Sequence, residues 1–161
     1  MAKYQAVTVW QGEMAFAART GSGHEVTMDA APEVGGGDQG PRPTELLLAS
    51  LGGCTAMDVI SILRKMRVQV DRFEVATEGE RAAEHPRIFT GIEVVYRLWS
   101  PDPDPDVVEK YRKAVDLSWT KYCSIANLLK FGSWLRYRAE LNGAEVFRGE
   151  HPAPAHLSGQ G

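Results

Sequence analysis

Two cysteines are the residues of this 161-residue chain best suited to redox chemistry. Cys54 follows Gly52 and Gly53 inside an apolar run, and Cys123 lies 69 positions later, directly after Tyr122. Two such thiols are either unreactive buried side chains or a reactive pair that meets in the folded protein. The apolar neighbours of Cys54, taken alone, favour an unreactive buried side chain.

Two local features favour a reactive pair. Gly52 and Gly53 each cost a helix about 1 kcal/mol, so we interpret them as positions where another backbone or a ligand comes close to Cys54. Cys123 is predicted to begin a helix, and a helix N-terminus favours the thiolate form. Asp58, four positions after Cys54, is predicted to lie on nearly the same helix face, where it could tune the thiol or form a buried ion pair.

The elements that must position these residues begin with three strands, predicted over 4–10, 14–19 and 24–29 from their β-branched and aromatic residues and the glycines between them. The glycine-rich segment 31–42 is predicted to be a loop. It lacks the Gly-Lys-Ser/Thr sequence that gives a phosphate-binding loop its cation and metal ligand.

A long apolar helix is predicted to start at Pro43 and to run through Cys54 to the region of Met66. Its apolar residues wrap most of the way round, which predicts a central helix or one covered by a partner subunit. Further elements are predicted in the order strand, strand, helix, helix, strand: 68–77, 88–99, a helix that Asp106 caps, a short helix after Cys123, and 134–141. This order predicts an α+β fold with antiparallel sheets around a central buried helix.

Composition limits the classes of function. A net charge of −3 and a pI near 5.8 argue against a nucleic-acid surface, and no apolar run is long enough for a membrane span. The start of the chain has no signal region, so a cytoplasmic protein is expected. We predict one domain over 1–147 and a disordered tail over 148–161. The spacing of cysteines and histidines predicts no metal site, and no cofactor is expected.

The segments 42–55 and 123–129 together resemble the two cysteine motifs of the OsmC/Ohr family. The resemblance extends over about residues 4–143 and agrees with the predicted order of elements. It implies an OsmC-like fold and an intertwined homodimer with two equivalent sites at the subunit interface. It also implies thiol-dependent reduction of organic hydroperoxides.

In the chemistry that this resemblance implies, Cys54 attacks the peroxide oxygen and becomes a sulfenic acid, with which Cys123 condenses to a disulfide. A dithiol reductant of the lipoyl type restores the pair. The family's thiolate-binding arginine is matched by Arg19, and Glu45 is a possible orienting carboxylate. The chain departs from the peroxidase pattern at Thr44, where a glutamate is usual, and just after Cys123, where serine replaces proline.

A second hypothesis keeps the fold but not the activity. In this alternative the chain is a non-enzymatic OsmC-like dimer that binds a small apolar ligand at the subunit interface. Geometry discriminates between the two: a peroxidase needs Cys54 and Cys123 close enough to form a disulfide and a cation near Cys54. His24 is a weaker candidate for the site and is more simply interpreted as a loop residue.

Overall fold

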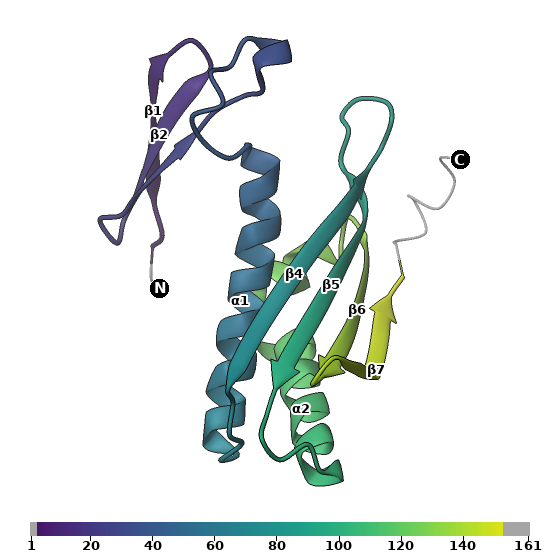
Figure 1. Cartoon of the computed structure of the whole chain (residues 1–161). Coiled ribbons are helices and arrows are strands. Elements are labelled where there is room, and N and C mark those ends of the chain that lie inside the picture. The colour runs from purple at the N-terminus through teal and green to yellow at the C-terminus, as the bar shows by residue number, and fades with distance from the viewer. Residues whose placement is uncertain (1–2, 153–161) are drawn as a thin grey trace. The chain divides into compact units, whose positions relative to one another are not determined.

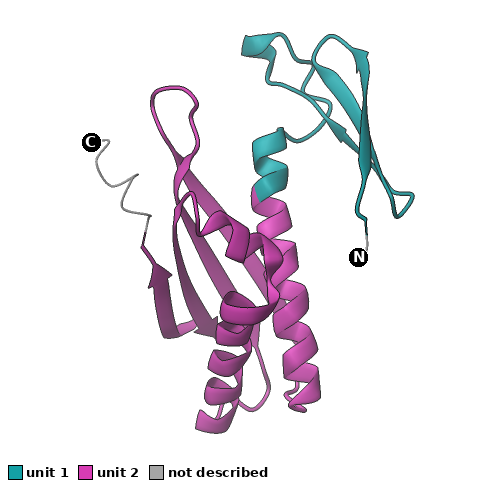
Figure 2. Ribbon diagram, turned by 180° about the vertical axis from the view of Figure 1, so that it is seen from behind, with its two compact units in different colours: residues 1–47 teal, residues 48–161 magenta. Residues whose placement is uncertain are grey.

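The computed structural model describes residues 3–152 and contains two compact units, divided after Leu47 (Figure 2). The first unit is a three-stranded antiparallel sheet in the order β1-β2-β3 (Figure 1). Its strands are β1 (Ala6–Gly12), β2 (Ala15–Thr20) and β3 (Glu25–Met28), followed by the single turn η1 (Pro32–Val34). The three predicted strands are therefore confirmed.

The glycine-rich loop of the first unit is organised around the buried carboxylate of Asp29. This carboxylate accepts hydrogen bonds from the backbone N–H groups of Ala30 at 2.7 Å, Gly37 at 2.9 Å and Gln39 at 3.1 Å. These bonds, of which the one from Gln39 has the largest effect, hold the pKa of Asp29 below its ordinary value of 3.8. These three backbone N–H groups of the loop therefore bind the carboxylate of Asp29 in the same chain.

The second unit contains a four-stranded sheet in the order β4-β5-β6-β7. The strands are β4 (Arg72–Arg81), β5 (Phe89–Trp99), β6 (Trp134–Leu141) and β7 (Ala144–His151). The prediction of purely antiparallel sheets is wrong at one pair, because β5 and β6 are parallel. The helical connection between them returns the chain to the same end of the sheet, as parallel pairing requires.

The predicted disordered tail begins too early. Strand β7 was not predicted, and it pairs with β6 as far as His151. The boundary predicted between residues 147 and 148 therefore falls inside a strand. The remainder of the predicted tail, 153–161, lies outside the described residues.

The helices are α1 (Pro43–Lys65), α2 (Pro105–Leu117), the π-helical turn η2 (Ser118–Tyr122) and α3 (Ser124–Leu129). The residue that caps α2 is Asp104, whose Oδ1 accepts the N–H of Val107 at 2.8 Å. The prediction that Asp106 is the cap was therefore wrong by two residues. Pro105 takes the first helical position, where its missing N–H costs nothing.

The helices of the second unit cover one face of its sheet (Figures 1 and 2). Alternate residues of β5 from Ile92 to Leu98 belong to the core cluster that they share with the helices. The opposite face carries a ladder of charges, in which Arg97 lies 3.9 Å from Glu74 and 3.4 Å from Glu140 on the neighbouring strands. One face is thus apolar and the other solvated, as in most sheets that are covered on one side only.

Helix α1 buries a stripe rather than its whole circumference. Leu51, Thr55, Val59 and Leu63 are fully buried at intervals of four residues, whereas Met57 is 71% exposed. The single chain therefore does not bury α1 on nearly all sides, and the alternative, a helix covered by a partner subunit, stays a prediction. By length and composition α1 is long and apolar enough to cross a membrane, which the sequence analysis did not expect of any segment. Within the chain, 28% of its most apolar window is buried. The chain leaves an apolar helix face uncovered.

Tyr111 offers a test of the core. Its ring packs edge-on against Phe147 at 5.3 Å, while its hydroxyl is buried and has no hydrogen-bond partner among residues 3–152. An unsatisfied buried hydroxyl costs free energy, so we expect Tyr111→Phe to raise the free energy of unfolding by about 1 kcal/mol. The matched control is Tyr96→Phe, which removes a hydroxyl bonded to Thr55 at 2.6 Å and should destabilise the chain. Urea denaturation measures both, and equal losses would contradict the assignment.

Candidate active site

The two cysteines meet in the second unit. The Sγ atoms of Cys54 and Cys123 and a carboxylate oxygen of Asp58 all lie within 4.8 Å of one another. Helix α1 supplies Cys54 and Asp58 one turn apart, and Cys123 lies in the link between η2 and α3. Cys54 is half-buried, whereas Cys123 is completely buried. The predicted approach of the two thiols is confirmed.

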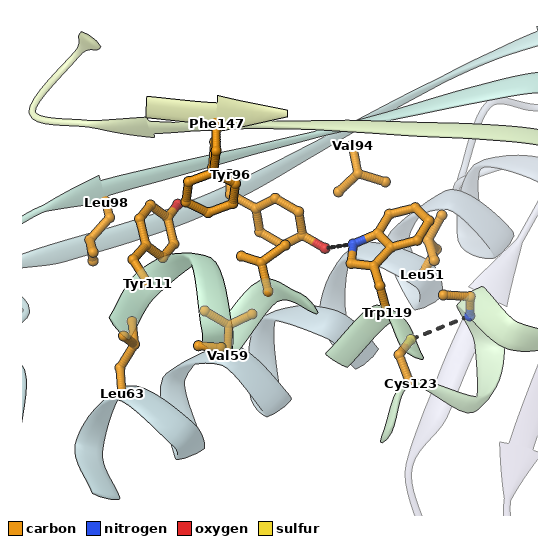
Figure 3. Close-up of a cluster of buried hydrophobic side chains, with 14 of the residues drawn as sticks. Leu51, Val59, Leu63, Val94, Tyr96, Leu98, Tyr111, Trp119, Cys123 and Phe147 are labelled. Carbon is orange, nitrogen blue, oxygen red and sulfur yellow. Dashed lines mark hydrogen bonds between the residues drawn. The ribbon is translucent and has the colours of Figure 1, made fainter. Parts of the chain in front are cut away.

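Cys123 is held as a thiol. It caps α3, and its Sγ accepts the backbone N–H of Ala126 at 3.3 Å (Figure 3). Burial, followed by its hydrogen bond with Cys54, nevertheless raises the pKa of Cys123 to about 12. The expectation that a helix N-terminus favours its thiolate is therefore wrong, because the loss of hydration outweighs a single backbone N–H.

A chain of buried hydrogen bonds ends at the carboxylate of Asp58. The Trp119 indole donates to the Tyr96 hydroxyl at 2.6 Å (Figure 3). The Tyr96 hydroxyl also lies 2.6 Å from the Thr55 hydroxyl. The Thr55 hydroxyl in turn lies 2.8 Å from that of Ser118, and the Ser118 hydroxyl donates to Asp58 Oδ2 at 2.9 Å.

The two ends of this chain fix its direction. An indole N–H can only donate and a carboxylate can only accept, so each hydroxyl between them passes one hydrogen bond towards Asp58. The three elements α1, β5 and η2 are thereby locked together beside the thiols. Thr55 interrupts the apolar stripe of α1, and this was the one signal of the network in the sequence. Nothing local in the sequence indicated Tyr96, Ser118 or Trp119.

Lys130 is a cation near the thiols that the sequence analysis missed. Its Nζ donates to the backbone carbonyl of Trp119 and, at 3.3 Å, to Asn127 Oδ1. Burial lowers the pKa of Lys130, and its coulombic interaction with Cys123 acts in the opposite direction. Lys130, one residue beyond α3, therefore lies near enough to interact with Cys123 when that residue is charged.

The two glycines before Cys54 have different surroundings. A Cβ atom at Gly52 would lie 3.3 Å from Thr77 Cγ2, so this glycine lets α1 pack closely on β4. A Cβ at Gly53 would meet nothing within 4 Å among the described residues. Another element does approach Gly52 closely, but its nearest atom belongs to the Thr77 side chain and its nearest backbone atom, the Val75 carbonyl oxygen, is 3.8 Å away.

The first unit holds the other predicted site residues. The side chain of Arg19 is 73% exposed and lies 3.3 Å from Glu25 on the adjacent strand. Glu45 accepts the backbone N–H of Arg42 at 2.8 Å, which is the reciprocal bond of a helix-capping motif. Within its own chain Glu45 therefore caps α1, and its orienting role at the thiols stays a prediction. His24 bonds Ser22 through Nδ1 at 3.1 Å and so takes the loop role.

The thiol cluster also has donor types that ligate metals. The expectation that the chain holds no metal stays a prediction, because a bound metal would itself displace the thiol protons. We describe the cluster as a thiol pair with an adjacent carboxylate.

A groove of about 440 Å³ reaches the cluster at Asp58. Its apolar lining comes from Ile62, Met66, Leu117 and Tyr122, and its polar lining from Asp58, Ser61 and Lys65. An apolar molecule in this groove would therefore contact the carboxylate that adjoins the two sulfurs.

An α+β unit with a thiol on its long helix and a second thiol at the start of a short one defines a class of protein. The family model described as OsmC-like protein matches residues 35–138. The chain therefore belongs to the OsmC-like protein family.

Individual relatives agree with this assignment. Protein YhfA of Escherichia coli K12 is 40% identical over 126 residues, which are 78% of this chain and 89% of YhfA. The crystal structure of a hypothetical protein from Aquifex aeolicus VF5 is 30% identical, with a TM-score of 0.75 over 88% of this chain and 98% of that one. An organic hydroperoxide resistance protein from Elizabethkingia anophelis shares the fold, at 13% identity and a TM-score of 0.61 over 88% and 96% of the chains.

The hydrogen-bond chain can be tested at Thr55. Thr55→Val keeps the shape of the side chain but leaves the hydroxyls of Tyr96 and Ser118 without their shared partner. We expect the free energy of unfolding to fall by about 1–3 kcal/mol in urea denaturation. Thr120→Val is the control, because its exposed hydroxyl only bonds the carbonyl of Asp116 in its own helical segment. Equal effects of the two substitutions would show that the network does not stabilise the fold.

Proposed function

We propose that this protein is a thiol-dependent peroxidase that reduces organic hydroperoxides through Cys54 and Cys123. The observation that carries the proposal is the close approach of a half-buried thiol and a fully buried one on separate elements. This asymmetry suits two successive roles. The accessible Cys54 meets the substrate, and the buried Cys123 meets only what forms on Cys54.

The proposed reaction balances in three steps. The Cys54 thiolate attacks the terminal peroxide oxygen, the O–O bond breaks, and the products are a sulfenic acid and, after protonation, an alcohol. Cys123 then attacks the Cys54 sulfur and water leaves as the disulfide forms. A dithiol reductant of the lipoyl type restores both thiols and is itself oxidised to a disulfide. The groove beside Asp58 is where we place the apolar part of the hydroperoxide.

Arg19 is our proposed activating cation. A guanidinium can hold a thiolate and also donate to the leaving oxygen of the peroxide. Its ion pair with Glu25 is exposed, and exposed pairs contribute at most about 1 kcal/mol, so the guanidinium can exchange partners readily.

The assembly that we propose is a homodimer in the cytoplasm. The uncovered face of α1, with Met57 exposed, gives a second chain an apolar surface to cover. Free thiols so close together are the state that a reducing compartment maintains.

The peroxidase proposal is tested by following peroxide consumption with dihydrolipoamide as reductant. We expect wild type to turn over cumene hydroperoxide faster than hydrogen peroxide, because the groove is largely apolar. Cys54→Ser should reduce the rate to background. Cys123→Ser should consume one equivalent of peroxide and then stop under these conditions. If wild type and Cys54→Ser are equally slow with two different dithiols, the proposal is wrong.

The dimer is tested by Met57→Glu, since this side chain is 71% exposed in the single chain and can be changed without disturbing its core. We expect the dimer dissociation constant to rise by about 10–100-fold, because the new carboxylate would be buried without a partner. Analytical ultracentrifugation measures it, and Lys113→Glu on the exposed side of α2 is the control. A wild type that is monomeric at micromolar concentration would refute the dimer.

A second candidate function is binding of a small apolar ligand without catalysis. The same groove favours it, because its lining of Ile62, Met66, Leu117 and Tyr122 needs no chemistry at the sulfurs. Such a ligand would bind Cys54→Ser as tightly as wild type, which isothermal titration calorimetry with medium-chain acyl compounds would show.

A further inference from the structure

The reaction needs a group to accept the proton of Cys123. This thiol is completely buried, and burial together with its hydrogen bond to Cys54 raises its pKa to about 12. At neutral pH Cys123 is therefore a thiol that must lose its proton before it can attack. A resolving thiol in this state requires a base at its side.

The Asp58 carboxylate is in the position that such a base must occupy. One of its oxygens lies within 4.8 Å of both sulfurs, a separation that one bridging water or a small movement of the side chain would close for proton transfer. Its Oδ2 is occupied by the Ser118 hydroxyl, and Ser118 is its one hydrogen-bond donor among the residues from 3 to 152. The described residues therefore leave Asp58 further capacity to accept a hydrogen bond or a proton.

The hydrogen-bond chain gives the carboxylate a fixed orientation. Ser118 is held by Thr55, which is held in turn by Tyr96 and, beyond it, Trp119. A base that must act within a few tenths of an ångström needs this kind of support from the groups behind it. The chain leads from the core to Asp58, and its members have no contact with solvent that would explain their polarity.

We propose that Asp58 is the general base for Cys123 in the step that closes the disulfide. This inference deepens the proposed peroxidase function and rests on it for the identity of the leaving group. Asp58 takes the proton from Cys123, the Cys123 sulfur attacks the Cys54 sulfur, and the S–O bond of the sulfenic acid breaks. The hydroxide that leaves takes the proton from Asp58, so water and a disulfide form and the carboxylate is restored.

Other titratable groups also surround Cys123, and each must be considered as an alternative to Asp58 for the base that accepts its proton. Lys130 acts on it electrostatically from beyond α3, Tyr96 does so from β5, and Cys54 and Asp58 face it from α1. The Nζ of Lys130 already donates to the Trp119 carbonyl and to Asn127, and an ammonium cannot accept a proton. Burial raises the pKa of Tyr96 above its ordinary value, and its oxygen already bonds Trp119 and Thr55, so it remains a neutral phenol.

A probe that bypasses peroxide chemistry separates this inference from the proposed function. The reagent 5,5′-dithiobis(2-nitrobenzoate) places thionitrobenzoate on the more accessible Cys54, and Cys123 then expels it as the disulfide closes. The second release of thionitrobenzoate, followed by stopped-flow absorbance, reports the attack of Cys123 alone. The thionitrobenzoate that leaves in this step needs no proton, unlike the hydroxide that leaves a sulfenic acid. Cys123→Ser should show only the first release.

We expect Asp58→Asn to slow the second release by about 100-fold or more while changing the first by less than threefold. Its second-phase rate should rise about tenfold per pH unit between pH 6 and 9, as the thiolate of Cys123 becomes populated. Asp116→Asn is the matched control, because that carboxylate is also half-buried and accepts a hydroxyl, from Tyr137 at 2.8 Å, away from the thiols. It should leave both phases unchanged. Ser118→Ala should give an intermediate slowing.

The pH profile of wild type keeps the inference testable even if Asp58→Asn does not fold. If the proton of Cys123 passes to Asp58 rather than to hydroxide, the second release should rise much less than tenfold per pH unit in wild type between pH 6 and 9. A tenfold rise per unit in wild type, or an unchanged second phase in a folded Asp58→Asn, would overturn the assignment. If the wild type is inactive towards peroxide but both releases of thionitrobenzoate behave as expected, only the peroxidase proposal is overturned.

Discussion

The hydroxyl of Thr55 is the contact on which the arrangement of the second unit depends. It lies in the fully buried stripe of α1 and bonds both Tyr96 of β5 and Ser118 of η2. A buried hydroxyl is satisfied only when its partners are correctly placed, so these bonds fix the rotation of α1 about its own axis. With Thr55 facing the core, helix periodicity places Cys54 about 100° and Asp58 about 60° to the same side. The core contact thereby determines where the thiol and the carboxylate point.

The different burial of Cys54 and Cys123 gives the two thiols different roles in the proposed reaction. The same loss of water that strengthens the hydrogen bonds behind Asp58 disfavours a charge on Cys123. Cys123 is kept protonated next to a half-buried Cys54, so the two residues cannot exchange roles. A peroxide would meet the accessible sulfur first, and the buried sulfur would react only with a neighbour already oxidised. The sequence of steps in the proposed reaction thus follows from the burial of Cys123 and needs no conformational change.

Features that depend on local pattern could be predicted from the sequence, and those that depend on distant contacts could not. The apolar run after Pro43 and the alternation in β5 revealed their elements because each pattern is complete within its segment. Strand β7 was missed because few of its residues are β-branched, although the Asn142-Gly143 turn before it was a usable signal. The parallel pairing of β5 and β6 depends on the path of the chain between them. Similarly, an apolar composition all round α1 did not indicate which face its own chain would cover.

The space beside Cys54 is the feature that the single chain does not explain. At Gly52 an added Cβ would lie 3.3 Å from Thr77 Cγ2, but at Gly53 it would meet none of the described residues within 4 Å, and Gly53 still costs α1 about 1 kcal/mol relative to alanine. A residue kept small without an intrachain reason indicates that something else occupies that space in the working protein. A thiolate at Cys54 also needs a cation that can donate to a leaving oxygen, and Lys130 is already bonded to the Trp119 carbonyl and Asn127. The open position at Gly53 leaves room for a partner surface or the substrate to approach Cys54, and the free cation is the role that we propose for Arg19.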